Sequence, residues 1–260
     1  MSVQLDSLVS SLVDSAPPGE LNGVQKDLAA ILPGQERLIN SSIESFIESK
    51  GGLFGGYVAS SLNKLSGSTK FVDYVHKKLF NIDLKNQQAI DIESYEPEET
   101  YPSYYDELVE LLKQYGKDHY PSTYGFTVIP KNDEVVVIIV GQKLNTENYY
   151  TGQWNSVYRI KNGTITGDVA VDIHYYEDGN VRLNFNETLK DSVTAGGRNI
   201  VNFINNSENQ LTLKIVDSFN DLNVKYFKNL RRLLPITRAK INWGNAIGNY
   251  RLGSDVVNQK

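Results

Sequence analysis

The chain has 260 residues, a formal net charge of −5, 40% hydrophobic and 22% charged residues, a composition typical of a globular protein with a substantial core. It contains no cysteine, which excludes disulfides, thiolate metal sites and cysteine catalysis. Its first residues lack the basic segment and apolar run of a secretory signal, and no apolar stretch approaches the ~20 residues of a membrane span. We therefore expect a cytoplasmic protein without a transmembrane segment.

Residues 1–50 predict three short helices. Apolar residues recur at helical spacing in three runs, and Pro17-Pro18-Gly19 and Pro33-Gly34 separate these runs. Helices of this length are marginally stable alone, so their apolar faces must pack together. We expect an N-terminal antiparallel helical bundle.

Residues 51–123 show little regular pattern. We expect an irregular middle region with short strands near residues 70–75 and 89–92. Tyr105 to His119 predicts a helix, because its leucines lie on one face.

The apolar period changes to two at Tyr124, and an antiparallel sheet is predicted over residues 124–186. The five strand candidates are 124–129, 135–140, 153–161, 164–176 and 181–185. Short turns such as Asn162-Gly163 join them, so consecutive strands should be neighbours in a five-stranded meander. Segment 135–140 is apolar on both faces and should be central.

Residues 194–234 predict one long helix, amphipathic from Asn199 to Leu234. Its apolar residues recur in steps of three or four, with one gap around Glu208, and Pro235 ends it. The helix would span roughly 55 Å, whereas five strands are only about 20 Å wide. We expect an α+β fold in which this helix covers one face of the sheet, and a partner subunit that continues the sheet to receive the excess helix.

The chain becomes basic where the long helix ends. Seven basic residues and no acidic residue lie between Leu222 and Ser254, although the chain as a whole is acidic. A helix C-terminus accounts for the cations before Pro235 but not for those after it. The segment predicts binding of an acidic protein, of anionic lipid head groups or, least favoured, of nucleic acid. Six of the seven cations are Lys228, Arg231, Arg232, Arg238, Lys240 and Arg251.

Residues 235–260 predict a basic turn followed by an amphipathic tail. A helical projection places most large apolar residues after Trp243 on or beside one face, and three glycines weaken the helix. Such a tail either frays or folds onto a partner.

No catalytic, cofactor or metal site is predicted. The histidines at positions 76, 119 and 174 are dispersed, and no metalloprotease, phosphate-loop, dinucleotide or nucleophile-elbow pattern occurs. We expect His119 to cap its helix or to satisfy a buried group, and Trp154 and Trp243 to serve as packing anchors.

Several segments resemble one family. Residues 230–243 (LRRLLPITRAKINW) closely resemble the C-terminal signature of the F-actin-capping protein alpha subunit. Residues 16–21 (APPGEL), 117–120 (KDHY), 150–156 (YTGQWNS) and 174–181 (HYYEDGNV) are similar to further motifs of that family, in the same order.

The resemblance implies a subunit of an alpha/beta heterodimer in which two five-stranded sheets join into one of ten strands, above a stalk of N-terminal helices. It implies Ca²⁺-independent binding to the fast-growing (barbed) end of actin filaments, which blocks subunit exchange. The expected location is the cytoplasmic actin cytoskeleton, including cortical structures.

By position, the family's actin-binding residues correspond to a basic cluster and to the tail. They are Lys228, Arg231, Arg232, Arg238, Lys240, Trp243, Ile247, Tyr250, Leu252 and Val256. The resemblance also implies phosphatidylinositol 4,5-bisphosphate and capping regulators as partners. The alternative is a membrane-surface adaptor that binds anionic phosphoinositides through the same basic region.

Overall fold

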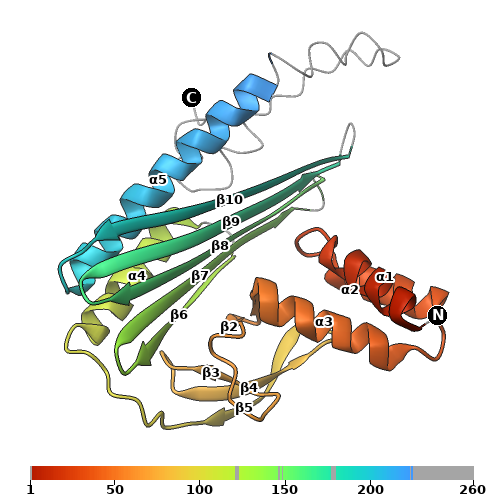
Figure 1. Cartoon of the computed structure of the whole chain (residues 1–260), viewed down its shortest axis with the longest axis horizontal. Helices are drawn as coiled ribbons and strands as arrows, with labels where there is room; N and C mark the ends of the chain where they lie inside the picture. The colour runs from red at the N-terminus through yellow and green to blue at the C-terminus, as the bar shows by residue number, and fades with distance from the viewer. Residues whose placement is uncertain are drawn as a thin grey trace.

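The structure is a computed structural model that describes residues 2–120, 123–145, 147, 149–176, 180–222 and 224 (Figure 1). The helices are α1 (Ser2–Asp14), α2 (Leu21–Ile31), α3 (Glu36–Lys50), α4 (Tyr105–His119) and α5 (Gly197–Leu222). The strands are β1 (Gly52–Phe54), β2 (Tyr57–Ala59), β3 (Phe71–Asp73), β4 (Lys78–Asp83), β5 (Gln88–Ser94), β6 (Thr123–Lys131), β7 (Glu134–Asn145), β8 (Tyr150–Lys161), β9 (Thr164–Tyr175) and β10 (Val181–Ser192).

Helices α1, α2 and α3 form the predicted N-terminal bundle (Figure 1). Val9 and Val13 of α1 are buried against Ile39 and Ile43 of α3, and Leu28 of α2 belongs to the same core. Burying these side chains gives short helices the stability that they lack alone.

The middle region is more regular than the sequence predicts. β1 and β2 form a hairpin, and β3, β4 and β5 form a three-stranded sheet. The short strands expected near residues 70–75 and 89–92 are present as β3 and β5, whereas the sequence did not predict β1, β2 and β4. The hairpin packs beneath the main sheet, where Leu53 and Val58 contact a cluster with Ile129, Val136 and Ile138.

The main sheet has the order β10-β9-β8-β7-β6 with antiparallel neighbours, which confirms the predicted meander. Asn162 and Gly163 both adopt positive φ in the β8–β9 turn, as a tight hairpin requires. Segment 135–140 is buried on both faces as predicted, but its strand β7 lies second from the edge, and β8 is the central strand.

The strands extend further than their apolar residues indicate. β10 runs to Ser192, six residues past the predicted sheet boundary at position 186, and pairs with β9 along its whole length. Most of its last residues are polar and exposed. Backbone pairing continues there without an apolar pattern to reveal it.

Two helices cover one face of the sheet, whereas the sequence predicted a single covering helix. Both α4 and α5 lie on the face that carries Trp154, Tyr158 and Ile165, while the bundle and β1–β2 lie on the opposite face (Figure 1). The described part of α5 has 26 residues and is about 39 Å long. Its predicted continuation to Leu234 and end at Pro235 lie outside the described residues.

Candidate functional site

The predicted actin-binding residues, from Lys228 to Val256, all lie outside the described part of the chain. The structure instead describes the platform that precedes them, which consists of α5, the sheet beneath it and the bundle on the far side. The contacts that hold these three parts together are described below.

Helix α5 lies on the sheet through an apolar stripe. Ile200, Ile204, Leu211 and Ile215 are each at most 2% exposed. The step from Ile204 to Leu211 is seven residues, two helical turns, and the turn between them contributes Glu208. This is the gap that the sequence pattern shows.

Glu208 is fully buried and its carboxylate accepts four hydrogen bonds from hydroxyl groups. The Tyr115 and Tyr120 hydroxyls each donate to Oε2 over 2.6 Å. Ser156 Oγ and the Tyr158 hydroxyl each donate to Oε1 over 3.0 Å. A buried carboxylate is costly unless such donors satisfy it, so this cluster is a complete polar site within an apolar core.

The cluster extends to neighbouring side chains. Trp154 Nε1 donates to Ser156 Oγ over 2.8 Å, so the indole is a packing anchor as predicted. Burial raises the pKa of the Tyr124 hydroxyl well above its ordinary value, and the negative charge of Glu208 adds to the effect.

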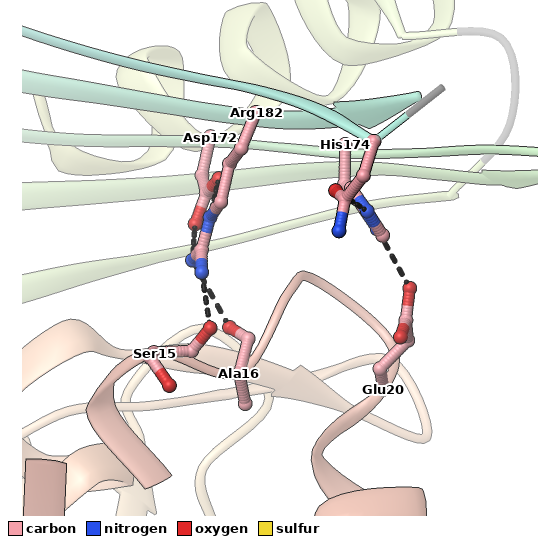
Figure 2. Close-up of polar contacts among 7 residues, drawn as sticks. Ser15, Ala16, Glu20, Asp172, His174 and Arg182 are labelled. Atoms are coloured by element: carbon pink, nitrogen blue, oxygen red, sulfur yellow. Dashed lines mark hydrogen bonds and ion pairs between the residues drawn. The ribbon is translucent and has the colours of Figure 1, made fainter. Parts of the chain in front are cut away.

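A second polar contact ties the bundle to the opposite face of the sheet (Figure 2). The Arg182 guanidinium on β10 donates to both Asp172 oxygens on β9, over 3.0 and 2.5 Å. The same group donates to the carbonyl oxygens of Ser15 and Ala16, where α1 ends. Asp172 raises the pKa of Arg182, which keeps the guanidinium charged.

His174 provides the next link from β9 to the bundle (Figure 2). Its Nδ1 lies 3.0 Å from Glu20 Oε1 at the start of α2, and its Nε2 lies 2.9 Å from Asn180 Oδ1. The ring stacks on Tyr176 with a centroid distance of 4.9 Å. Both ring nitrogens therefore have a polar partner, one in the bundle and one beside the end of β9.

A cavity of about 740 Å³ lies between the bundle and the sheet. Its lining includes Leu21 and Phe46 from the helices and Gln153, Asn155 and Asn184 from the sheet. The described residues hold no group of three or more potential metal ligands.

The other two histidines have structural contacts. His119 Nδ1 lies 2.9 Å from the Tyr115 carbonyl oxygen of the same helix, whereas the residue that caps α4 is Tyr120. His76 Nδ1 lies 2.6 Å from Asp73 Oδ2 in a turn. Among the described helices, none is long and apolar enough to cross a membrane.

The sequence did not predict the roles of Glu208, Arg182 and the Glu20–His174 pair. For Glu208 a signal existed, because an acidic residue within an apolar helical stripe requires a buried partner or a break in the packing. For Arg182 no signal existed, since its acceptors are backbone carbonyls more than 160 residues earlier in the chain.

The fold is similar to that of a solved actin capping subunit. The chain matches a solved structure described as a homodimeric actin capping protein alpha subunit from Plasmodium berghei. The TM-score is 0.76 and the sequence identity is 16%, and the match covers 92% of this chain and 100% of that chain.

The sequence comparisons give the family. The F-actin capping protein alpha subunit model matches residues 9–255. The F-actin-capping protein subunit alpha of Debaryomyces hansenii is 59% identical over 263 residues, covering 100% of this chain and 99% of the relative. Its counterpart in Candida albicans is 49% identical over 280 residues, covering both chains completely. The chain therefore belongs to the F-actin capping protein alpha subunit family, as its motifs predict.

Proposed function

We propose that this chain pairs with a beta subunit and that the heterodimer binds the barbed end of actin filaments without Ca²⁺, blocking the addition and loss of subunits. The match of the family model to residues 9–255 carries the proposal, because it includes the basic segment and most of the tail. The proposed contacts are the basic cluster from Lys228 to Lys240 and the apolar tail residues from Trp243 to Val256.

The mechanism is steric and electrostatic. Seven basic residues without an acidic one favour an acidic filament surface, and such complementarity accelerates association more than it strengthens the final complex. The tail adds apolar contact area, which slows dissociation. No bond is made or broken.

An open sheet edge supports the beta subunit as partner. β10 pairs only with β9 among the described strands, and its twelve residues leave a long row of backbone groups for another strand. Leu8 and Leu12 on α1 are 56% and 44% exposed, one turn apart, and provide a second apolar surface. We propose that the complex acts in the cytoplasm, including the cortical actin network.

Seeded actin elongation with the co-expressed heterodimer tests this function. The double variant Arg232→Glu/Arg238→Glu should fold and dimerise, but its association with filament ends should slow by about tenfold and lose most of its salt dependence. Capping by the parent protein should be equal with calcium and with a calcium chelator.

The matched control is Lys85→Glu/Lys131→Glu, which changes the net charge equally at two exposed positions, one in a turn and one at the end of β6. The control should cap like the parent. Unchanged capping by the Arg232/Arg238 variant contradicts the assignment, and so does an equal loss in both double variants, since it would reflect net charge alone.

The same basic segment favours a second, regulatory activity. Multivalent anionic head groups suit clustered Lys and Arg side chains, and phosphatidylinositol 4,5-bisphosphate carries several phosphates. We expect vesicles that contain this lipid to release the complex from filament ends, whereas neutral phosphatidylcholine vesicles should not. Strong vesicle binding without any effect on actin seeds would instead favour a membrane-surface adaptor.

A further inference from the structure

The sheet-facing stripe of α5 has one polar position at its centre. Ile204 and Leu211 flank Glu208 at distances of four and three residues, and all three side chains are buried. Apolar burial has no direction, so a stripe of Ile and Leu on a sheet of similar side chains tolerates more than one alignment. Hydrogen bonds have a direction and a narrow range of lengths.

The four donors to Glu208 come from two regions of the fold, helix α4 with its C-terminal end and strand β8. Tyr115 lies in α4, Tyr120 follows α4, and Ser156 and Tyr158 lie in the central strand β8. A shift of α5 by one residue moves its side chains by about 1.5 Å along the helix axis and about 100° around it. Any such shift separates the carboxylate from all four donors and breaks these four buried hydrogen bonds.

We propose that Glu208 is a positioning residue that locks α5 in a single register on the sheet and so sets the direction in which the chain enters the basic segment. A single buried polar group is the best-attested device for fixing helix register. Leu222, where α5 ends in the described residues, is 14 residues and about 21 Å beyond Glu208. The helix carries any rotation at Glu208 to that end. The link to the basic segment rests on the proposed function, whereas the register itself does not.

Distance measurement between two spin labels tests the register directly. The chain has no cysteine, so labels can be attached at Leu213→Cys, on the exposed side of α5, and at Lys161→Cys, at the exposed end of β8. The sample is the heterodimer with the cysteines of the beta subunit replaced. The variants are Glu208→Leu, Glu208→Gln and, as matched control, Leu211→Ala.

The parent complex should give one narrow distance distribution. Glu208→Leu should broaden it or add a second distance, because four hydroxyls lose their acceptor while the apolar contacts remain. Glu208→Gln should keep it narrow, since an amide both accepts from and donates to hydroxyl groups. Leu211→Ala should also keep it narrow although it lowers the melting temperature, because it removes packing and no directional bond.

A narrow, unshifted distribution in Glu208→Leu overturns the proposal, and so does equal broadening in Leu211→Ala. If Glu208→Leu fails to fold, the double variant Tyr120→Phe/Tyr158→Phe replaces it. A narrow, unshifted distance distribution in this double variant overturns the proposal. The double variant removes one donor from each carboxylate oxygen and preserves both rings.

Capping kinetics test the consequence for the filament. Dissociation from barbed ends should be about tenfold faster for Glu208→Leu and unchanged for Leu211→Ala. Unchanged dissociation of Glu208→Leu, despite a broadened distance, overturns the link between register and filament binding. A parent complex that does not cap at all rejects the proposed function and leaves the distance measurement valid.

Discussion

Individual buried hydroxyl groups differ in how the fold satisfies them. Those of Tyr115, Tyr120 and Tyr158 donate to Glu208. The hydroxyl of Tyr150, at the start of β8, is buried without a hydrogen-bond partner among the residues that the structure describes. Burial raises the pKa of Tyr150 above its ordinary value, because the tyrosinate anion would lose its hydration.

This difference predicts the effect of Tyr150→Phe on alkaline stability. A pKa raised on folding contributes stability that is present below the unfolded pKa of about 10 and is lost as the pH rises beyond it. At about pH 11 the loss is roughly 1.4 kcal/mol for one such tyrosine. Tyr150→Phe should abolish this loss, and it should leave the free energy of unfolding at neutral pH unchanged or higher by about 1 kcal/mol.

Chemical denaturation of the complex at about pH 8 and pH 11 measures both effects. The control is Tyr149→Phe, whose side chain is 46% exposed, and it should lose as much stability at alkaline pH as the parent. Equal alkaline losses in Tyr150→Phe and the parent would contradict the prediction.

Helix α4 depends on a glycine for its contact with the sheet. A Cβ built on Gly116 would lie 1.9 Å from Cε1 of Tyr124. That ring cannot move aside easily, because its hydroxyl donates to the Leu112 carbonyl over 2.9 Å and its face stacks on Tyr120. Gly116 therefore permits close approach of β6 to the helix.

Two Gly→Ala substitutions in helices should have opposite effects. Gly116→Ala should lower the free energy of unfolding by about 1–3 kcal/mol through overpacking, despite the better helix propensity of alanine. A Cβ added at Gly23 in α2 has no atom within 4 Å, so Gly23→Ala should raise the free energy of unfolding by up to about 1 kcal/mol. Thermal unfolding of both variants measures these two opposite changes in stability. Stabilisation by Gly116→Ala would show that the contact with Tyr124 is not close.

The elements with a long apolar period were predictable from sequence. The helix Tyr105–His119 has the predicted ends. Among the strands of the meander, β9 was found from its alternating buried residues and β7 from an apolar run that is buried on both faces. The strands β1, β2 and β3 have only three residues each and are too short to show a two-residue period. The predicted strand 181–185 stops before the second half of β10, because most residues there are polar and exposed and give no apolar pattern.

The candidate functional residues also fall into those that local sequence patterns predict and those that only the folded chain brings together. Local motifs identify the basic segment, whereas the Glu208 cluster joins residues 50 to 93 positions apart and depends on the folded chain. The sequence predicts the Pro17-Pro18-Gly19 turn, but it does not predict that Arg182 binds the chain just before this turn.

At the scale of the whole molecule, the bundle and the sheet meet through a few polar contacts around a cavity. Arg182 is the main one, because it joins β9, β10 and the end of α1 with one side chain (Figure 2). Its side chain is 25% exposed, so water only partly replaces these bonds.

Arg182→Ala should loosen the bundle without unfolding the sheet. Four acceptor atoms lose their donor, and we expect a loss of about 2 kcal/mol together with faster amide hydrogen exchange in α1 and α2. Arg159→Ala is the control, since its ion pair with Asp168 is on the same face but more exposed and is worth less than about 1 kcal/mol. Equal exchange rates in the two variants would show that Arg182 does not hold the bundle.

The order of the elements along the chain also governs how the protein is made. α5 follows every strand of the sheet, so the ribosome completes β10 before it adds the helix that covers Trp154 and Tyr158. The roughly 30 residues from Ser192 to Leu222 take a few seconds to synthesise at about 5–20 residues per second. Throughout that interval the nascent sheet exposes an apolar face, an open edge and the hydroxyls that await Glu208. A ribosome that pauses before Gly197 prolongs the state in which this subunit is most prone to aggregate.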